Sequence, residues 1–151
     1  MPPSDRSAQI SALYQEMILD HYRRPRNKGE IENPDETIVM KNPLCGDEIE
    51  VQIRYEGDSV ADIAFSGRGC SISQASASMM TQMIKGKSVA EIDELRNQFR
   101  SMVMGNADAD EKSLGSLRAL GGVARFPARV KCALLAWNAL EEAQKNHEQG
   151  S

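Results

Sequence analysis

The sequence predicts an α+β fold in which a small antiparallel sheet packs against helices. Apolar and polar residues alternate over residues 48–55, which is the period of a strand with one buried face, and Ala61, Ile63 and Phe65 continue at alternate positions. After Cys70 the apolar residues instead recur at steps of three and four, which indicates helices. Strands followed by a run of helices are typical of the α+β class.

Three strands account for the first part of this pattern. The stretch "ETIVM" at residues 36–40 predicts the first strand, and residues 48–55 predict the second. The turn sequence "EGDS" then leads into a third strand, which has Ala61, Ile63 and Phe65 at alternate positions and ends at "SGRGC". We therefore expect a sheet of about three antiparallel strands.

Helices are expected both before and after these strands in the sequence. A first helix should end before Pro25, because the residue before a proline disfavours the helical conformation. After Cys70, one helix should end near Gly86, and a capping box of Ser88 and Glu91 should start the next. Pro127 suits the first turn of the last helix. The apolar face of the first helix consists of Ile10, Leu13, Tyr14, Met17, Ile18 and His21.

The whole chain, residues 1–151, has the length of one domain. Its polar, glycine-containing stretch at about residues 105–125 is expected to hold one short helix near residues 114–120. The net charge of −4 gives no reason to expect nucleic-acid binding. No apolar run reaches the roughly 18 residues of a membrane span, and "MPPSDRSAQI" lacks the apolar core of a secretory signal. Three widely separated cysteines favour a reducing compartment, so we expect a cytoplasmic protein.

The cysteines and one carboxylate are candidate metal ligands. Cys45 and Asp47 flank Gly46 just before the second strand, and side chains two residues apart in extended chain share a side. Cys70 falls where a strand becomes a helix, and the amide groups of a helix N-terminus favour a thiolate. Cys132 lies near the start of the last helix. Three thiolates and a carboxylate would suit zinc.

A second interpretation of the cysteines stays open at this point. Cysteine is among the most buried residue types, so each thiol alone is also explained as a small core residue. The sequence contains no Cys-x-x-Cys pair, so neither a zinc-ribbon signature nor a thioredoxin motif is present. Spacing alone does not decide between a metal site and core packing.

Four segments together carry a resemblance to a known family. "HYRRPRN", "NPLCGDEIEV", "FSGRGCSISQASASMM" and "RVKCALLAWNAL" resemble the U-type iron–sulfur assembly proteins, the family of IscU and the NifU N-terminal domain, over nearly the whole chain. IscU-like scaffolds have a histidine directly before the last cysteine, whereas this chain has Lys131 there. In this respect the chain resembles the SufU branch of the family. The stretch at about 105–125 is an insertion relative to IscU and is also typical of SufU. The family fold is a small antiparallel sheet packed with helices, in agreement with the elements above.

The resemblance implies a zinc-dependent sulfurtransferase of the SUF system. On this basis Cys45, Asp47, Cys70 and Cys132 match the family's zinc ligands, and Arg125 matches an arginine near the metal. Cys45 matches the residue that accepts persulfide sulfur from a cysteine desulfurase, SufS. The SUF scaffold complex is a further candidate partner.

Two other functions remain as alternatives. An iron–sulfur scaffold of the IscU type could use the same thiolates, since cluster irons accept them, although Lys131 in place of histidine counts against it. A noncatalytic binding module could use zinc only to stabilise its fold. Asp47 counts against that function, because structural zinc sites favour cysteine and histidine.

Overall fold

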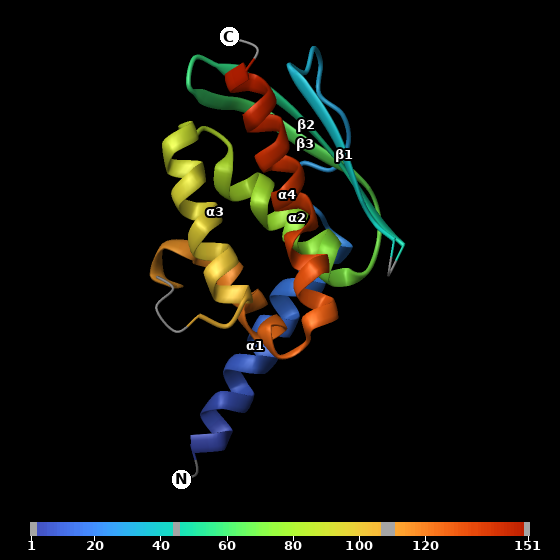
Figure 1. Ribbon diagram of the computed structural model, residues 1–151. Helices are drawn as coiled ribbons and strands as arrows, with labels where there is room; N and C mark the ends of the chain where they lie inside the picture. The colour runs from blue at the N-terminus through green and yellow to red at the C-terminus, as the bar shows by residue number, and fades with distance from the viewer. Residues whose placement is uncertain (1–2, 44–45, 107–110, 150–151) are drawn as a thin grey trace.

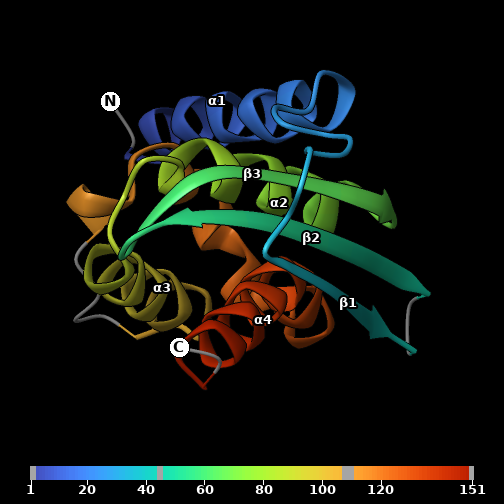
Figure 2. The same cartoon turned by 90° about the horizontal axis from the view of Figure 1, so that it is seen from above.

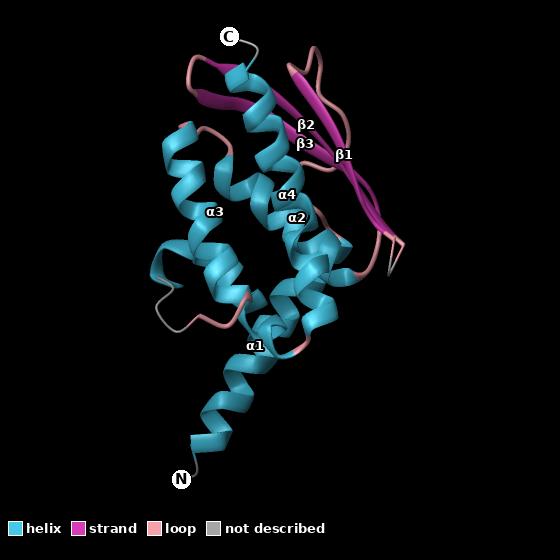
Figure 3. Ribbon diagram, in the orientation of Figure 1, coloured by secondary structure: helices cyan, strands magenta, loops and turns pink. Residues whose placement is uncertain are grey.

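The computed structural model describes residues 3–43, 46–106 and 111–149. It confirms the α+β class, with the strands in one sheet and the helices beside it (Figures 1 and 3). Within the described ranges, none of the helices combines the length and apolar character needed to span a bilayer. In chain order the elements are α1 (Pro3–Arg23), β1 (Glu36–Asn42), β2 (Asp47–Glu56), β3 (Ser59–Arg68), α2 (Ser71–Ile84), α3 (Val89–Val103), the 3₁₀ segment η1 (Glu111–Arg125) and α4 (Pro127–Gln149).

The three strands pair antiparallel in the order β1-β2-β3, as the sequence predicts. Val51 lies at the centre of β2, opposite Ile38 on β1 and Phe65 on β3. Alternate residues of β2 are fully buried, because a strand presents every second side chain to the same face. Gly57 adopts a φ of 62° in the turn between β2 and β3, a conformation that glycine accepts without steric cost.

The helices cover one face of this sheet. Helix α4 packs on β1 and β2, while α2 packs on β3, so these two helices lie side by side beneath the strands (Figure 2). Helix α1 packs against α2 and η1, and its N-terminal part extends away from the sheet (Figure 1). The arrangement places the core between the sheet and α2, α3 and α4.

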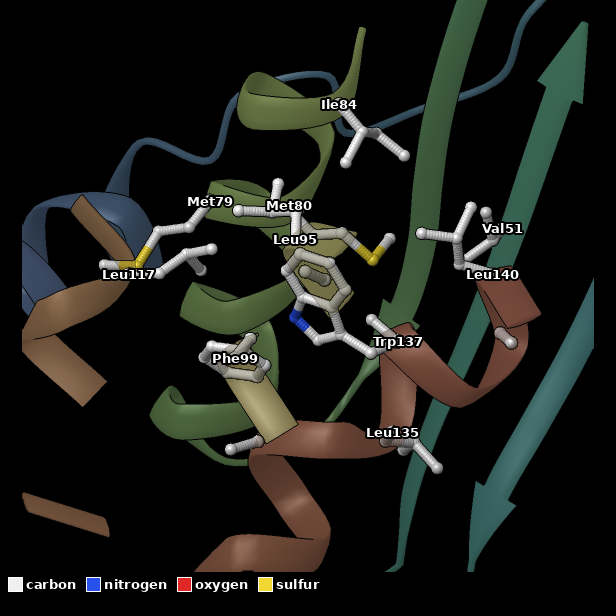
Figure 4. Packing of buried hydrophobic residues seen from close by; sticks show 14 of the residues in the cluster. Val51, Met79, Met80, Ile84, Leu95, Phe99, Leu117, Leu135, Trp137 and Leu140 are labelled. Carbon is white, nitrogen blue, oxygen red and sulfur yellow. The ribbon is translucent and has the colours of Figure 1, made fainter. Parts of the chain in front are cut away.

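Trp137 on α4 lies at the centre of the core (Figure 4). Its ring stacks on Phe99 of α3, with 4.9 Å between ring centroids, and its Nε1 donates to Ser76 Oγ on α2 at 3.2 Å. The Ser76 hydroxyl in turn donates to the carbonyl oxygen of Ala133 at 2.6 Å. This pair of hydrogen bonds joins α2 to α4 within the apolar core.

The polar stretch before the last helix differs from the expected short helix. It forms 3₁₀ structure over Glu111–Arg125, interrupted at Gly115, where φ is 54° and ψ is −126°. A 3₁₀-helix has three residues per turn, so residues spaced by three share one face. That face is buried in the core, and it consists of Leu114, Leu117, Leu120 and Val123.

The first helix also differs in part from its predicted apolar face. Leu13 is 60% exposed, whereas His21 is only 5% exposed and places its Nδ1 2.7 Å from Ser78 Oγ on α2. Arg24 and Arg26 at the helix exit form ion pairs with Asp20, at 2.6 and 2.7 Å. Both arginines therefore contact a carboxylate on the last turns of α1.

The chain after α1 is held against the sheet by backbone hydrogen bonds. Phe65 on β3 donates its N–H to the Asn27 carbonyl at 3.0 Å and accepts the Gly29 N–H at 2.8 Å. The Arg26 N–H donates to Ser78 Oγ at 2.8 Å. The "HYRRPRN" segment thus connects α1, α2 and the outer edge of β3.

Candidate metal centre

Three of the four predicted ligands meet at one end of the sheet. Asp47 begins β2, Cys70 directly precedes α2, and Cys132 lies in the second turn of α4. One ligand atom from each of the three residues lies within 4.8 Å of the other two. The fourth predicted ligand, Cys45, lies outside the described residues. Residues far apart in sequence thus converge as a metal site requires.

The packing of α2 on α4 positions the two thiols. Cys70 is the N-cap residue of α2, and the hydrogen bond from Ser76 Oγ to the Ala133 carbonyl fixes α2 to α4 one residue after Cys132. Gly46 adopts a φ of 72°, and its N–H donates to the Asn42 carbonyl at 2.9 Å at the end of the β1–β2 hairpin. This local turn directs the start of β2, and with it Asp47, toward Cys70.

The carboxylate of Asp47 is buried and contacts Cys70 through both oxygens. Oδ1 accepts the Cys70 N–H at 3.0 Å, and Oδ2 lies 3.8 Å from Cys70 Sγ. Asp47 is 2% exposed. The unsatisfied amides and the positive dipole end of α2 favour negative charge at this position, and no acidic residue lies in the helix's own first turn.

Zinc fits this donor set. Tetrahedral zinc binds sulfur at about 2.3 Å and a carboxylate oxygen at about 2.1 Å, which separates the two ligand atoms by about 3.6 Å. The observed separation of 3.8 Å between Cys70 Sγ and Asp47 Oδ2 is close to that value. Burial of a carboxylate is costly without a compensating charge, and a divalent cation between the two thiols would supply one.

Cys132 occupies a different environment from Cys70. Its Sγ donates to the Ala128 carbonyl at 3.6 Å, one turn back in α4, and its side chain is 3% exposed. Since α4 begins at Pro127, Cys132 lies beyond the first turn, where helix amides already have partners. The free amide groups of a helix N-terminus therefore favour a thiolate at Cys70 but not at Cys132.

The predicted arginine lies on a groove beside the cluster. Arg125 ends η1 and is exposed, and it shares the lining of a groove of about 580 Å³ with Ser71, the residue after Cys70. Phe126 and Arg129 line the same groove, and Phe126 is 60% exposed. The groove is therefore apolar in part, carries two guanidinium groups, and adjoins the start of α2.

Neither histidine belongs to the cluster. His21 contacts Ser78, eight residues along α2 from Cys70, which is a distance of about 12 Å along a helix. His147 stacks on Tyr55 with 3.8 Å between ring centroids, and lies about 22 Å along α4 from Cys132. Among the described residues, the three candidate ligands are thus a carboxylate and two thiols.

Sequence reasoning did not identify Ser73 as part of this site. Ser73 is 1% exposed, its Oγ donates to the Cys70 carbonyl at 3.1 Å, and the same oxygen lies 3.9 Å from Cys70 Sγ. Its position three residues after the N-cap was an available signal, because residues at this spacing contact each other in the first turn of a helix.

Comparison with known sequences identifies a family and relatives of the chain. Residues 13–133 match the family of NifU-like N-terminal domains. The chain is 46% identical over 145 residues to the zinc-dependent sulfurtransferase SufU of Bacillus subtilis, covering 96% of this chain and 98% of that protein. It is 44% identical over 138 residues to the iron–sulfur cluster assembly scaffold protein IscU of Streptococcus pyogenes, covering 91% of this chain and 86% of that protein.

Solved structures share the fold. A putative iron–sulfur cluster assembly scaffold protein for the SUF system from Fervidobacterium islandicum has a TM-score of 0.81 at 38% identity, covering 85% of this chain and 93% of that one. A NifU-like N-terminal protein from Brucella abortus has a TM-score of 0.84 at 24% identity, covering 91% and 96%, which supports the fold alone. From the matched family and these identities, the chain belongs to the NifU-like N-terminal domain family of U-type iron–sulfur assembly proteins.

Proposed function

We propose that this protein is a zinc-dependent sulfurtransferase that accepts persulfide sulfur from a cysteine desulfurase, SufS, for iron–sulfur cluster assembly in the cytoplasm. The observation that carries the proposal is the convergence of Asp47, Cys70 and Cys132 within 4.8 Å. A relative that is 46% identical over 96% of this chain is named a zinc-dependent sulfurtransferase, which supports the same function here.

Cys45 completes the proposed ligand set. It is two residues from Asp47 in sequence, and two residues of chain span at most about 7 Å. Cys45, Asp47, Cys70 and Cys132 would then hold the metal, with Arg125 near it. Bound zinc would keep the thiols deprotonated and would offset the charge of the buried Asp47 carboxylate.

The proposed transfer is a thiolate exchange at sulfur. The Cys45 thiolate attacks the outer sulfur of the desulfurase persulfide, and a new sulfur–sulfur bond forms as the original one breaks. The electron pair of the broken bond leaves with the donor cysteine, which becomes a thiolate. Because one persulfide replaces another, the step needs no added oxidant or reductant.

The groove beside the cluster supports docking of the desulfurase at this end of the molecule. It is continuous with the start of α2 through Ser71, and its exposed Phe126 offers apolar surface. Arg125 and Arg129 add positive charge, which would suit acidic groups on the partner. The donor persulfide must approach the cluster for transfer, so contact on this adjoining surface is favoured.

A desulfurase turnover assay tests the proposal. Adding the zinc-loaded protein should raise the rate of cysteine turnover by a desulfurase of the SUF system, because an acceptor clears its persulfide. The Cys45→Ser variant should give no increase, and an equal increase with this variant would refute the assigned role of Cys45. A noncatalytic zinc-stabilised module would give no increase even as the wild-type protein.

An iron–sulfur scaffold is the second candidate function. It is favoured by the relative in Streptococcus pyogenes, 44% identical, which is named an IscU scaffold. Metal analysis after anaerobic purification distinguishes the two functions. Stoichiometric zinc without a visible chromophore supports the sulfurtransferase, whereas a coloured, labile iron–sulfur cluster supports the scaffold.

A further inference from the structure

Gly69 lies directly against the candidate metal ligand Asp47. A Cβ atom built on Gly69 would stand 2.5 Å from Asp47 Oδ1 and 2.8 Å from its Cγ, and 2.5 Å from Ser73 Oγ. Real Cβ atoms essentially never approach another heavy atom closer than 3.0 Å. The space that any other residue would fill with its side chain is therefore occupied by the Asp47 carboxylate and the Ser73 hydroxyl.

That placement of the carboxylate determines which atoms its two oxygens contact. Oδ1 accepts the Cys70 N–H at 3.0 Å, which fixes the orientation of the carboxylate. Oδ2 then lies 3.8 Å from Cys70 Sγ, the separation expected for two ligands of one zinc ion. A displacement of the carboxylate by about 1 Å would change both the hydrogen bond and the ligand separation.

The contacts of Gly69 differ in kind from those of nearby Gly67. Gly67 has a φ of 122°, and a Cβ there would collide with the backbone carbonyl of Glu48 on the paired strand, so a side chain would damage the sheet itself. At Gly69 the φ is not in the left-handed region, and the closest atoms belong to side chains. A small side chain at Gly69 can be accommodated by moving Asp47 while the backbone stays in place.

We infer that Gly69 is a positioning residue for the metal centre: its lack of a side chain allows the Asp47 carboxylate to bind the Cys70 N–H through Oδ1 and to face the metal position through Oδ2. The inference rests on the proposed function, since it assumes that Asp47 is a metal ligand.

Zinc affinity of Gly69→Ala measures this role. Competition with a chromophoric zinc chelator should give an affinity about 10- to 100-fold weaker than that of the wild-type protein, the range typical when the support of a metal ligand is lost. Thermal unfolding of the zinc-free variant should stay close to that of the zinc-free wild type. Gly122→Ala is the matched control, because a Cβ there has no atom within 4 Å, and it should leave zinc affinity unchanged.

Two double variants identify the contact responsible. In an Asp47→Ala background, Gly69→Ala should cause no further loss of zinc affinity, since the displaced ligand is already absent. Removal of the Ser73 hydroxyl in Gly69→Ala/Ser73→Ala should not restore affinity. The inference would be overturned if Ser73→Ala restored the zinc affinity of Gly69→Ala. It would also be overturned if Gly69→Ala lowered zinc affinity by the same factor in the Asp47→Ala background.

The same experiments separate this inference from the proposed function. Wild-type affinity in Gly69→Ala would overturn the positioning role and leave sulfur transfer intact. A wild-type protein that fails to bind zinc would overturn the proposed function, and the inference with it.

Discussion

Among single residues, the two oxygens of the buried Asp47 carboxylate have different contacts. Oδ1 accepts the Cys70 N–H, and Oδ2 lies beside the Cys70 thiol. The family resemblance predicts both residues as ligands, and a carboxylate and a thiolate are groups that zinc accepts. The resemblance does not predict that the missing side chain of Gly69 leaves room for the Asp47 carboxylate beside Cys70. That contact depends on the three-dimensional approach of β2 to the start of α2.

Asp47→Asn tests the charge of this ligand apart from its hydrogen bond. The amide oxygen can still accept the Cys70 N–H, whereas the negative charge that favours the metal is lost. We expect zinc affinity to fall by more than about tenfold, with little change in the fold of the zinc-free protein. Chelator competition and far-ultraviolet circular dichroism measure the two quantities, and an unchanged affinity would contradict the assignment of Asp47 as a ligand.

At the scale of elements, the main departure from sequence-based expectation is the 3₁₀ segment η1. Leu114, Leu117 and Leu120 are buried at steps of three, whereas an α-helical interpretation looks for steps of three and four. Glycine and charged residues in the same stretch obscure this period. The insertion expected as a mainly polar connection therefore contributes a face to the core.

Leu117→Ala measures the contribution of η1 to stability. Leu117 is fully buried, so its truncation should lower the free energy of unfolding by about 2–5 kcal/mol. Lys112→Ala, on the exposed side of the same segment, should change it by less than about 0.5 kcal/mol. Urea denaturation gives both values, and equal small effects would show that η1 is not part of the cooperative core.

A buried histidine lies in the contact between α1 and α2. His21 Nδ1 is 2.7 Å from Ser78 Oγ, and the same oxygen accepts the Arg26 N–H at 2.8 Å. Burial lowers the pKa of His21 below its ordinary value of 6.5, and the charge of Arg26 lowers it further, while Asp20 opposes the shift. Protonation of His21 is therefore less favourable in the folded protein than in the unfolded chain.

This shift predicts loss of stability in mild acid. Between the lowered pKa of folded His21 and 6.5, the unfolded chain binds more protons, so the free energy of unfolding falls as the pH falls through this window. Urea denaturation of the zinc-free protein at about pH 7.5 and about pH 5.5 measures the loss. His21→Gln should reduce it, whereas His147→Gln should retain it. An unchanged loss in His21→Gln would contradict this origin.

At the scale of the whole molecule, the fold brings together segments that the sequence separates. The sheet, the helix order and the capping box at Ser88 follow from local patterns and were predictable. Convergence of β2, α2 and α4 was expected from family resemblance, because spacing alone contains no information on long-range packing. The exposure of Leu13 was not predicted, since a periodic apolar face does not show which of its residues lies at the edge of the covered surface.

The candidate metal ligands and a partly apolar groove lie at the same end of the molecule. The cluster of Asp47, Cys70 and Cys132 adjoins the groove that contains Arg125 and Phe126. The opposite end of α4, where His147 stacks on Tyr55, lies far along the helix from the thiols. This arrangement is compatible with the proposed approach of a desulfurase to the candidate metal centre.

The most direct test of sulfur transfer to Cys45 is mass spectrometry of the zinc-loaded protein after exposure to a SUF cysteine desulfurase and cysteine. We expect one extra sulfur atom, located on the peptide that contains Cys45, and its loss on treatment with a reducing agent. The Cys45→Ser variant should gain no sulfur under the same conditions. Sulfur bound equally by Cys45→Ser, or no sulfur on the wild-type protein while the desulfurase turns over, would contradict the proposed transfer to Cys45.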